Sequence, residues 1–348
     1  IVMMMRTATL KSISKATGFS VTTVSRALGG FDDVNDDTRR IILEEAQRQS
    51  YEPNLQARLL QGMRSQTIGL IIPAYGPRFS DPFFSQFVAG VGNQAAIAGF
   101  DLLLSTHAPT PDELDTYRRM VAGRRVDGLI LSRTRLHDAR IEYLAQTTMP
   151  FVVFGRTQTP ADYVYIDVDG YQGQAELTEH FISLGHQRIA YITPPQYLTF
   201  SYFRMQGFQD AMARHGLSIP TDYVVEGDLT ESSGYAAAST LLQLENPPTV
   251  IMTGNDLMAL GVISYALNRG LRVGDELAVG GFDDIPPAEH VHPGLTTMHQ
   301  PIYQIGQHLT QALLDLIEKK PSDQRGILMP PKLIVRGSSG EVRPNKRG

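Results

Sequence analysis

The chain has 348 residues, of which 42% are hydrophobic and 19% charged, a composition typical of a folded globular protein. It has no cysteine, which excludes disulfides, thiolate zinc sites and a cysteine nucleophile and is compatible with a reducing compartment. No apolar run reaches the roughly 18 residues of a membrane span, and the apolar start before Arg6 is too short for the core of an export signal. We therefore expect a cytoplasmic protein without a membrane partner.

The first 52 residues predict three short helices and no strand. Ile13 and Ala16 share one face of the first helix, which Gly18 can end. Ser20 can cap a second helix over residues 21–28, and a third helix is expected from about residue 35 to residue 50. Residues 53–66 predict a marginal helix in a linker, too short to be stable without a partner.

From Thr67 onward, short apolar segments alternate with amphipathic helical segments. The strand-like segments are TIGLII, DLLLS, VDGLIL, FVVFG, YVYIDV, RIAYIT, YVVEGD, TVIMTG and LAVGGFDD. This alternation predicts an α/β fold with parallel sheets covered by helices. Nine strand-like segments are more than one sheet of ordinary size usually holds. They divide into two groups near residues 155–167, which predicts two similar doubly wound lobes.

The segment TLKSISKATGFSVTTVSRALGG, followed by VNDDTRRIILEEAQRQSYEPNLQAR, has the spacing of a helix-turn-helix and resembles the LacI/GalR family of bacterial regulators. The resemblance continues through TIGLIIP, DPFF, RRVDGLIL, LGHQRIAYI, RMQGFQDAM, GDLTESSGY, TGNDLMALG, GGFDD and LTTMHQP. It implies a helix-turn-helix head over residues 1–52, a hinge over 53–66 and a periplasmic-binding-protein-like body. The first lobe is expected over residues 67–165 and 296–326, and the second over 166–295 and 327–341.

The second helix is the candidate recognition helix. Short polar and forked side chains at its N-terminal end suit base edges in the major groove. The resemblance places Val21 and Thr22 at base-reading positions and Thr23 and Ser25 nearer the phosphates. It also implies that the forked side chain of Arg26 can bind a guanine. The alternative is that these residues form an ordinary solvated face.

The hinge carries further candidate DNA contacts. Leu60 matches a leucine that family members insert into the minor groove, where an apolar side chain kinks a base step. Asn54 and Arg58 can supply polar contacts beside it. Leu59 and Gln61 depart from the polar and basic residues commoner in the family at these two positions.

In the body, the resemblance points to a polar set that would bind a sugar. Arg204 matches an arginine that donates to ligand hydroxyls, and Asn255 and Asp283 match an amide and a carboxylate at strand ends. Such groups read the donor and acceptor pattern of a polyol. The alternative for Asn255 and Asp283 is that each only caps a helix.

Apolar candidates accompany this set. Phe83 and Phe84 form either a wall for sugar C–H groups or ordinary core. Leu229 stands where several relatives carry an aromatic platform, so stacking there is weaker or comes from Tyr202 or Phe203. Asp169 fits either a cleft position or a helix cap.

No enzyme motif, cofactor motif or metal-binding cluster is found in the sequence. The sequence therefore predicts a sugar-responsive, DNA-binding repressor that recognises a palindromic operator as a homodimer and needs no cofactor. The resemblance to regulators of α-glucoside or disaccharide use suggests a mono- or disaccharide effector. The alternatives are an exported sugar-binding protein, a sugar-modifying enzyme, and a regulator with a non-sugar co-repressor.

Overall fold

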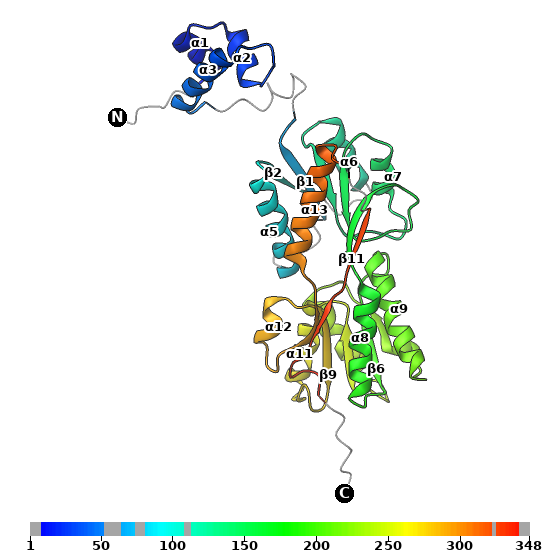
Figure 1. The fold of residues 1–348 in the computed structure, drawn as a ribbon. Coiled ribbons are helices and arrows are strands. Elements are labelled where there is room, and N and C mark those ends of the chain that lie inside the picture. The colour runs from blue at the N-terminus through cyan, green and yellow to red at the C-terminus, as the bar shows by residue number, and fades with distance from the viewer. Residues whose placement is uncertain (1–7, 52–63, 74–80, 108–112, 322–324, 341–348) are drawn as a thin grey trace, which may run out of the picture. The chain divides into compact units, whose positions relative to one another are not determined.

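The computed structural model describes residues 8–51, 64–73, 81–107, 113–321 and 325–340, and the chain divides into two compact units between Ser65 and Gln66 (Figure 1). The N-terminal unit, the head, contains α1 (Leu10–Thr17), α2 (Val21–Leu28) and α3 (Asp36–Arg48). The three predicted helices are thus confirmed. Among the described residues, no helix is both long and apolar enough to cross a bilayer.

Local capping sets the limits of the head helices. Thr9 and Ser12 form a reciprocal capping box at the start of α1, and Gly18 ends that helix with φ +77°. The Ser20 hydroxyl accepts the backbone N–H of Thr23 and so caps α2. The three helices enclose a small apolar core of Ile13, Val24, Ala27, Val34, Ile42 and Ala46.

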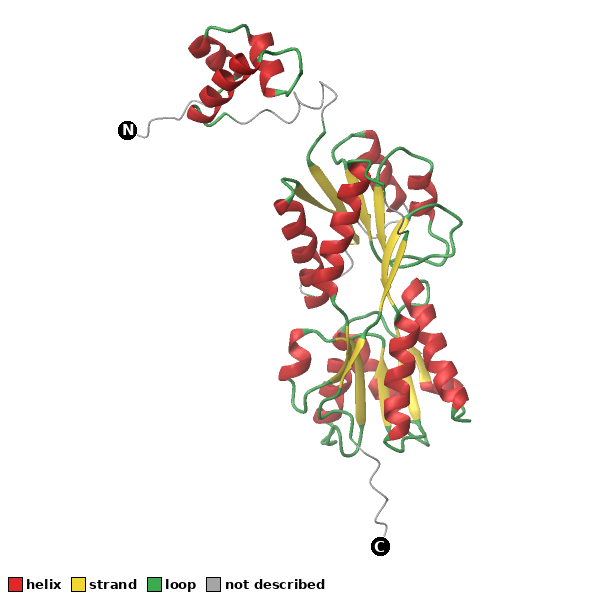
Figure 2. Cartoon of the chain, in the orientation of Figure 1, coloured by secondary structure: helices red, strands yellow, loops and turns green. Residues whose placement is uncertain are grey.

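The C-terminal unit, the body, has two α/β lobes (Figure 2). Within the described residues the first-lobe sheet has the order β11, β5, β4, β3, β1, β2, and all neighbouring strands are parallel. Its strands are β1 (Thr67–Pro73), β2 (Asp101–His107), β3 (Gly128–Leu131), β4 (Phe151–Phe154), β5 (Val164–Val168) and β11 (Gly326–Met329). Helices α5 (Pro82–Ile97) and α13 (Ile302–Ile317) cover one face, and α6 (Glu113–Ala122) and α7 (Ala139–Ala145) the other.

The second-lobe sheet has the order β12, β10, β9, β8, β6, β7 in the described part of the chain, and β12 is antiparallel to β10. Its strands are β6 (Ile189–Thr193), β7 (Val224–Glu226), β8 (Val250–Thr253), β9 (Ala278–Asp283), β10 (Thr296–His299) and β12 (Lys332–Ile334). Helices α8 (Gly170–Ser183) and α9 (Thr199–Arg214) cover one face, and α10 (Glu231–Leu241) and α11 (Asp256–Asn268) the other. A 3-10 turn (Thr221–Tyr223) precedes β7, and the short α12 (Pro286–His290) follows β9.

All nine predicted strand segments are strands, which confirms the two doubly wound lobes. The aliphatic runs are explained by burial on both faces of the sheet: Ile68 and Leu70 pack under α5 and α13, and Ile71 and Leu129 pack under α6 and α7. The close packing of α5 on α13 depends on Gly90, because a Cβ there would lie 2.1 Å from the Tyr303 carbonyl oxygen.

The lobe boundaries differ from the predicted ones by a few residues. The predicted break after residue 165 falls inside β5, whose last residue Val168 still pairs with Met329 of β11 in the first sheet. The breaks predicted before residue 296 and after residue 326 are also wrong, because β10 pairs with β9 in the second sheet and all of β11 pairs with β5 in the first. Strand pairing continues to the end of each strand, so within the described residues the chain passes between the lobes at residues 169, 300–301 and 330–331.

Candidate functional site

In the head, α2 presents most of the predicted DNA-reading residues away from the core. Val21, Thr22 and Arg26 are exposed, and Thr23 and Ser25 are half-buried, whereas Val24 is buried. The Arg26 guanidinium is held by two contacts within the head: it donates to Asp33 at 3.0 Å and lies 5.0 Å from the centre of the Phe31 ring. The surface thus has the predicted arrangement, and its DNA contacts stay a prediction. Asn54, Arg58 and Leu60 lie outside the described residues.

In the body, a cavity lies where the two lobes meet, at the carboxyl ends of their strands, as expected for open α/β sheets. It encloses about 840 Å³, counting the space at its mouth that is open to solvent. All six predicted ligand-binding residues line it: Phe83, Phe84, Arg204, Leu229, Asn255 and Asp283. The structure therefore brings together side chains that are up to 200 positions apart in sequence.

Arg204 is the central cation of the cavity. It comes from α9 and is 5% exposed, with its guanidinium carbon 3.6 Å from the centre of the Phe282 ring and 4.9 Å from that of Phe200. One terminal nitrogen donates to the Gly254 carbonyl, while Nε has no hydrogen-bond partner in the described structure. Burial lowers the pKa of Arg204, although neighbouring carboxylates oppose that effect. A ligand oxygen that accepts a hydrogen bond from this N–H would offset the free-energy cost of burying the donor without a partner.

Asp283 ends β9 at the edge of the cavity. Its carboxylate accepts from the Gln300 side chain, and burial raises its pKa well above the ordinary value, an effect that the nearby charge of Arg204 opposes. The backbone is strained here, with φ +131° at Asp283 and +59° at Asp284. Asp256 supports this turn by accepting the Ile285 N–H at 2.9 Å, and burial raises the pKa of Asp256 to about 6. Asp283 does not cap a helix.

Asn255 caps a helix and also lines the cavity. Its side-chain oxygen accepts the Met258 N–H at 3.1 Å and caps α11, as the alternative interpretation expected. Its amide nitrogen donates to the Leu229 carbonyl at 3.1 Å, and an amide nitrogen has two protons to donate. Leu229 adopts φ +71° to present that carbonyl. The cap therefore fixes an amide at the cavity wall.

The apolar walls are aromatic. Phe83 stacks on Phe154 with ring centres 6.2 Å apart, and Phe84 lies edge-on to Phe83 and is 4% exposed. The rings pack in the first-lobe core and also line the cavity, so their core role is confirmed and their contact with a sugar stays a prediction. Phe203 lines the cavity as well, whereas Tyr202 is not among the lining residues.

Several lining residues were missed by the sequence analysis: Asp81, Phe87, Ser132, Arg133, Thr134, Phe154, Asp167, Phe200 and Gln300. Asp167 is the most informative of them, because this buried carboxylate accepts from Arg156 Nε at 2.8 Å. Burial raises the pKa of Asp167, and Arg156 opposes that effect. Asp169, in contrast, only caps α8 by accepting the Gln172 N–H. Position at a strand end was the available signal for most of the missed residues, but not for Asp81, Phe87 and Phe200, which belong to the starts of α5 and α9.

Comparison with known proteins agrees with this arrangement. A family model of the periplasmic binding protein-like domain matches residues 178–339. The chain is 34% identical over 335 residues to the HTH-type transcriptional regulator AglR of Rhizobium meliloti (strain 1021). This match covers 95% of this chain and 94% of that relative.

Two solved structures extend the likeness to the whole fold. The transcriptional regulator CelR in complex with cellobiose is 30% identical, with a TM-score of 0.73, and the match covers 95% of this chain and 99% of that one. The lac repressor dimer bound to operator and the anti-inducer ONPF is 26% identical, with a TM-score of 0.82 and 96% and 100% coverage. These proteins are regulators and not enzymes. The chain belongs to the LacI family of transcriptional regulators, which bind operator DNA as dimers and respond to small-molecule effectors.

Proposed function

We propose that the chain is a cytoplasmic repressor of carbohydrate-utilisation genes and that a mono- or disaccharide in the interlobe cavity releases it from its operator. The observation that carries the proposal is the Arg204 guanidinium, buried with an unpartnered Nε beside the Asp283 carboxyl in a cavity with aromatic walls. Forked donors next to a carboxylate suit vicinal hydroxyls, and phenylalanine rings suit the C–H faces of a sugar ring.

The chemistry of the cavity supports a neutral polyol. Its lining includes two arginines and three aspartates, and Asn255 and Gln300 add amides of mixed donor and acceptor character. The binding of cellobiose by the similar regulator CelR supports the same ligand class. In the head, Val21, Thr22 and Arg26 are proposed to read bases, with Thr23 and Ser25 nearer the phosphates; Asn54, Arg58 and Leu60 are proposed to add hinge contacts.

The test is fluorescence anisotropy of the full chain on its own upstream DNA at fixed salt, with maltose, trehalose, sucrose, glucose or cellobiose added. We expect one of these sugars to weaken operator binding. The Asp283→Asn variant should bind DNA as wild type does but need about 10- to 100-fold more sugar for release, because an amide NH2 replaces one of the two oxygens that can accept from a ligand hydroxyl.

Asp222→Asn is the matched control, since Asp222 is exposed on the turn before β7 and does not line the cavity. It should respond to the sugar as wild type does. Tighter operator binding in the presence of a sugar would make the ligand a co-repressor. Operator binding that no sugar in the panel changes would contradict the carbohydrate assignment.

A further inference from the structure

A loop of the first lobe reaches across the rim of the cavity to the second lobe. It follows β3 and runs over residues 132–138. The Thr134 carbonyl accepts the backbone N–H of Thr199 at 2.8 Å, and Arg135 forms an antiparallel bridge with Leu198. Thr199 is the first residue of α9, the helix that carries Arg204. We call this loop and its contact with residues 198–199 the clasp.

The clasp supplies a hydrogen-bond acceptor for the first backbone N–H of α9. Helix N-termini leave backbone N–H groups without partners inside the helix, and a side-chain cap usually accepts one of them. The cap residue of α9 is Leu198, and no side-chain cap hydrogen bond is present there. A carbonyl of the other lobe supplies an acceptor instead, so the start of α9 depends on the first lobe.

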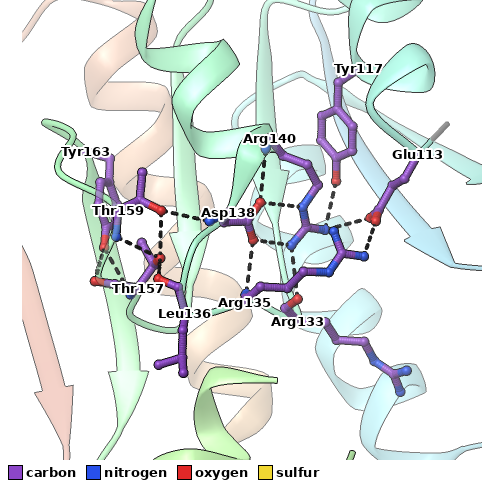
Figure 3. Close-up of polar contacts among 10 residues, drawn as sticks. All are labelled: Glu113, Tyr117, Arg133, Arg135, Leu136, Asp138, Arg140, Thr157, Thr159 and Tyr163. Carbon is purple, nitrogen blue, oxygen red and sulfur yellow. Dashed lines mark hydrogen bonds and ion pairs between the residues drawn. The ribbon is translucent and has the colours of Figure 1, made fainter. Parts of the chain in front are cut away.

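Buried ionic contacts hold the loop in place (Figure 3). Asp138 is completely buried and Arg140 is 3% exposed. Arg140 donates to both carboxylate oxygens of Asp138, at 2.9 and 2.7 Å, and to the Arg133 carbonyl at 3.0 Å. Asp138 in turn accepts the Arg135 N–H at 3.1 Å. The pair therefore binds the loop backbone on both sides of Thr134.

Two neighbouring segments complete this support. Glu113 of α6 accepts from Arg140 at 2.9 Å and pairs with Arg135 as well. On the other side, the Thr159 hydroxyl accepts the Asp138 N–H at 2.8 Å. Figure 3 shows these side chains converging on Asp138 and Arg140 from separate parts of the first lobe.

The loop backbone would not hold this shape alone. Arg133 adopts φ +54°, a region that residues with a Cβ rarely occupy. Its guanidinium carbon lies 5.0 Å from the centre of the Phe84 ring, in the cavity wall. Thr134 lines the same cavity and is 2% exposed. The ionic network thus fixes two cavity residues together with the carbonyl that reaches α9.

We infer that the clasp positions α9 across the cavity and that Asp138 and Arg140 are its positioning residues. They act on the effector site through the Thr134 carbonyl and the start of α9, which sets where Arg204 stands relative to the phenylalanine wall of the first lobe. The role of Arg204 toward an effector rests on the proposed function, whereas the clasp itself is a contact within the protein.

The test separates α9 from the loop while preserving the helix. Proline is tolerated at the first position of a helix, and Leu198, with φ −86° and ψ 133°, already has the conformation that precedes proline. Thr199→Pro removes the N–H and places its ring where the Thr134 carbonyl lies. Thr199→Ala retains the N–H, and the hydroxyl that it removes has no partner among the described residues.

Glu231→Pro is the matched proline control. Glu231 is the exposed first residue of α10 in the same lobe, and the preceding Thr230 has φ −106° and ψ 156°. Because the chain has no cysteine, Gln146→Cys in the first lobe and Gln209→Cys on α9, both exposed, accept a donor and an acceptor dye without background. Single-molecule energy transfer in the full chain then reports the position of α9 without any sugar.

We expect Thr199→Pro to shift the main transfer-efficiency peak to lower values, and Thr199→Ala and Glu231→Pro to keep the wild-type peak. A wild-type peak in Thr199→Pro, with the helical circular dichroism signal intact, would overturn the inference. Since no sugar is used, a failure here leaves the proposed function standing, and the absence of sugar release on DNA leaves the clasp standing.

A second measurement keeps the inference testable if Thr199→Pro fails to fold. The hydrogen bond from Thr199 to Thr134 flanks the bridge, which makes Arg135 and Leu198 a non-hydrogen-bonded antiparallel pair, with Cα atoms about 4.5 Å apart. This spacing suits a disulfide. Arg135→Cys with Leu198→Cys should form an intramolecular disulfide under mild oxidation, seen as a shift on a non-reducing gel. Thiols that stay free would overturn the clasp.

Discussion

The Arg140→Met variant tests whether the buried ionic network of the first lobe stabilises the body. Methionine retains much of the side-chain length but removes the hydrogen bonds to Asp138, Glu113 and the Arg133 carbonyl, which measure 2.7 to 3.0 Å. Asp138 would remain completely buried without its cation. Removing one partner of a buried pair costs about 3–5 kcal/mol, so we expect the free energy of unfolding to fall by about that amount.

The destabilisation of Arg140→Met should also depend on pH, because the pKa of Asp138 depends on Arg140. Burial alone would raise the pKa of Asp138, but the hydrogen bonds and charge of Arg140 bring it below the ordinary value. In the wild type, Asp138 therefore contributes stability above its unfolded pKa of about 3.9, and this is lost as the pH falls through the lower folded value. In Arg140→Met, burial raises the pKa of Asp138. The variant should therefore be most destabilised near neutral pH and less so in mild acid.

Urea unfolding followed by far-ultraviolet circular dichroism measures both effects, because the chain has no tryptophan to report by fluorescence. The matched control is Arg214→Met, since Arg214 pairs with Glu179 on the surface, where the two side chains are 48% and 46% exposed. The control should unfold at nearly the wild-type urea concentration. Equal stability of the two variants, or a deficit of Arg140→Met that grows on acidification, would refute the reasoning.

Three further substitutions test packing and capping. Gly207→Ala should lower the free energy of unfolding by about 1–3 kcal/mol in urea, because its Cβ would lie 2.2 Å from the Tyr171 carbonyl oxygen; Gly92→Ala, whose Cβ would meet only Leu102 at 3.7 Å, should be neutral or up to about 1 kcal/mol stabilising. Ser20→Ala should destabilise the head by about 1 kcal/mol in thermal unfolding and weaken operator binding in anisotropy, because α2 loses its cap; unchanged operator affinity would argue against α2 as the recognition helix.

The sequence was sufficient for the architecture because most predicted strands are short apolar runs, and β3, β6 and β8, for example, are buried along their whole length. The strands that it did not predict are β10, β11 and β12, which are three or four residues long. TTMH and KLI carry no pattern that separates them from loop sequence, and their pairing with β9 and β10 depends on long-range contacts. For the same reason the predicted lobe boundaries were displaced by a few residues.

The candidate site was predictable only in part. Arg204, Asn255 and Asp283 followed from the resemblance, and the structure places them in one cavity. Arg133 and Asp167 were not found, because a loop arginine and a strand aspartate look like ordinary surface residues until the fold brings them together. Asn255 caps α11 and also lines the cavity, so the cap does not exclude the predicted binding role.

The position of the cavity explains how an effector can act on the protein at all. A ligand shifts a conformational equilibrium only by its difference in affinity for the two states. Phe83 and Phe84 belong to the first lobe and Arg204 to the second, so a ligand that contacts both walls favours the arrangement that holds the lobes together. The clasp makes part of that contact within the protein itself, through Thr134 and Thr199. We therefore expect Thr199→Pro, which opens the clasp at a residue that does not line the cavity, to weaken effector binding.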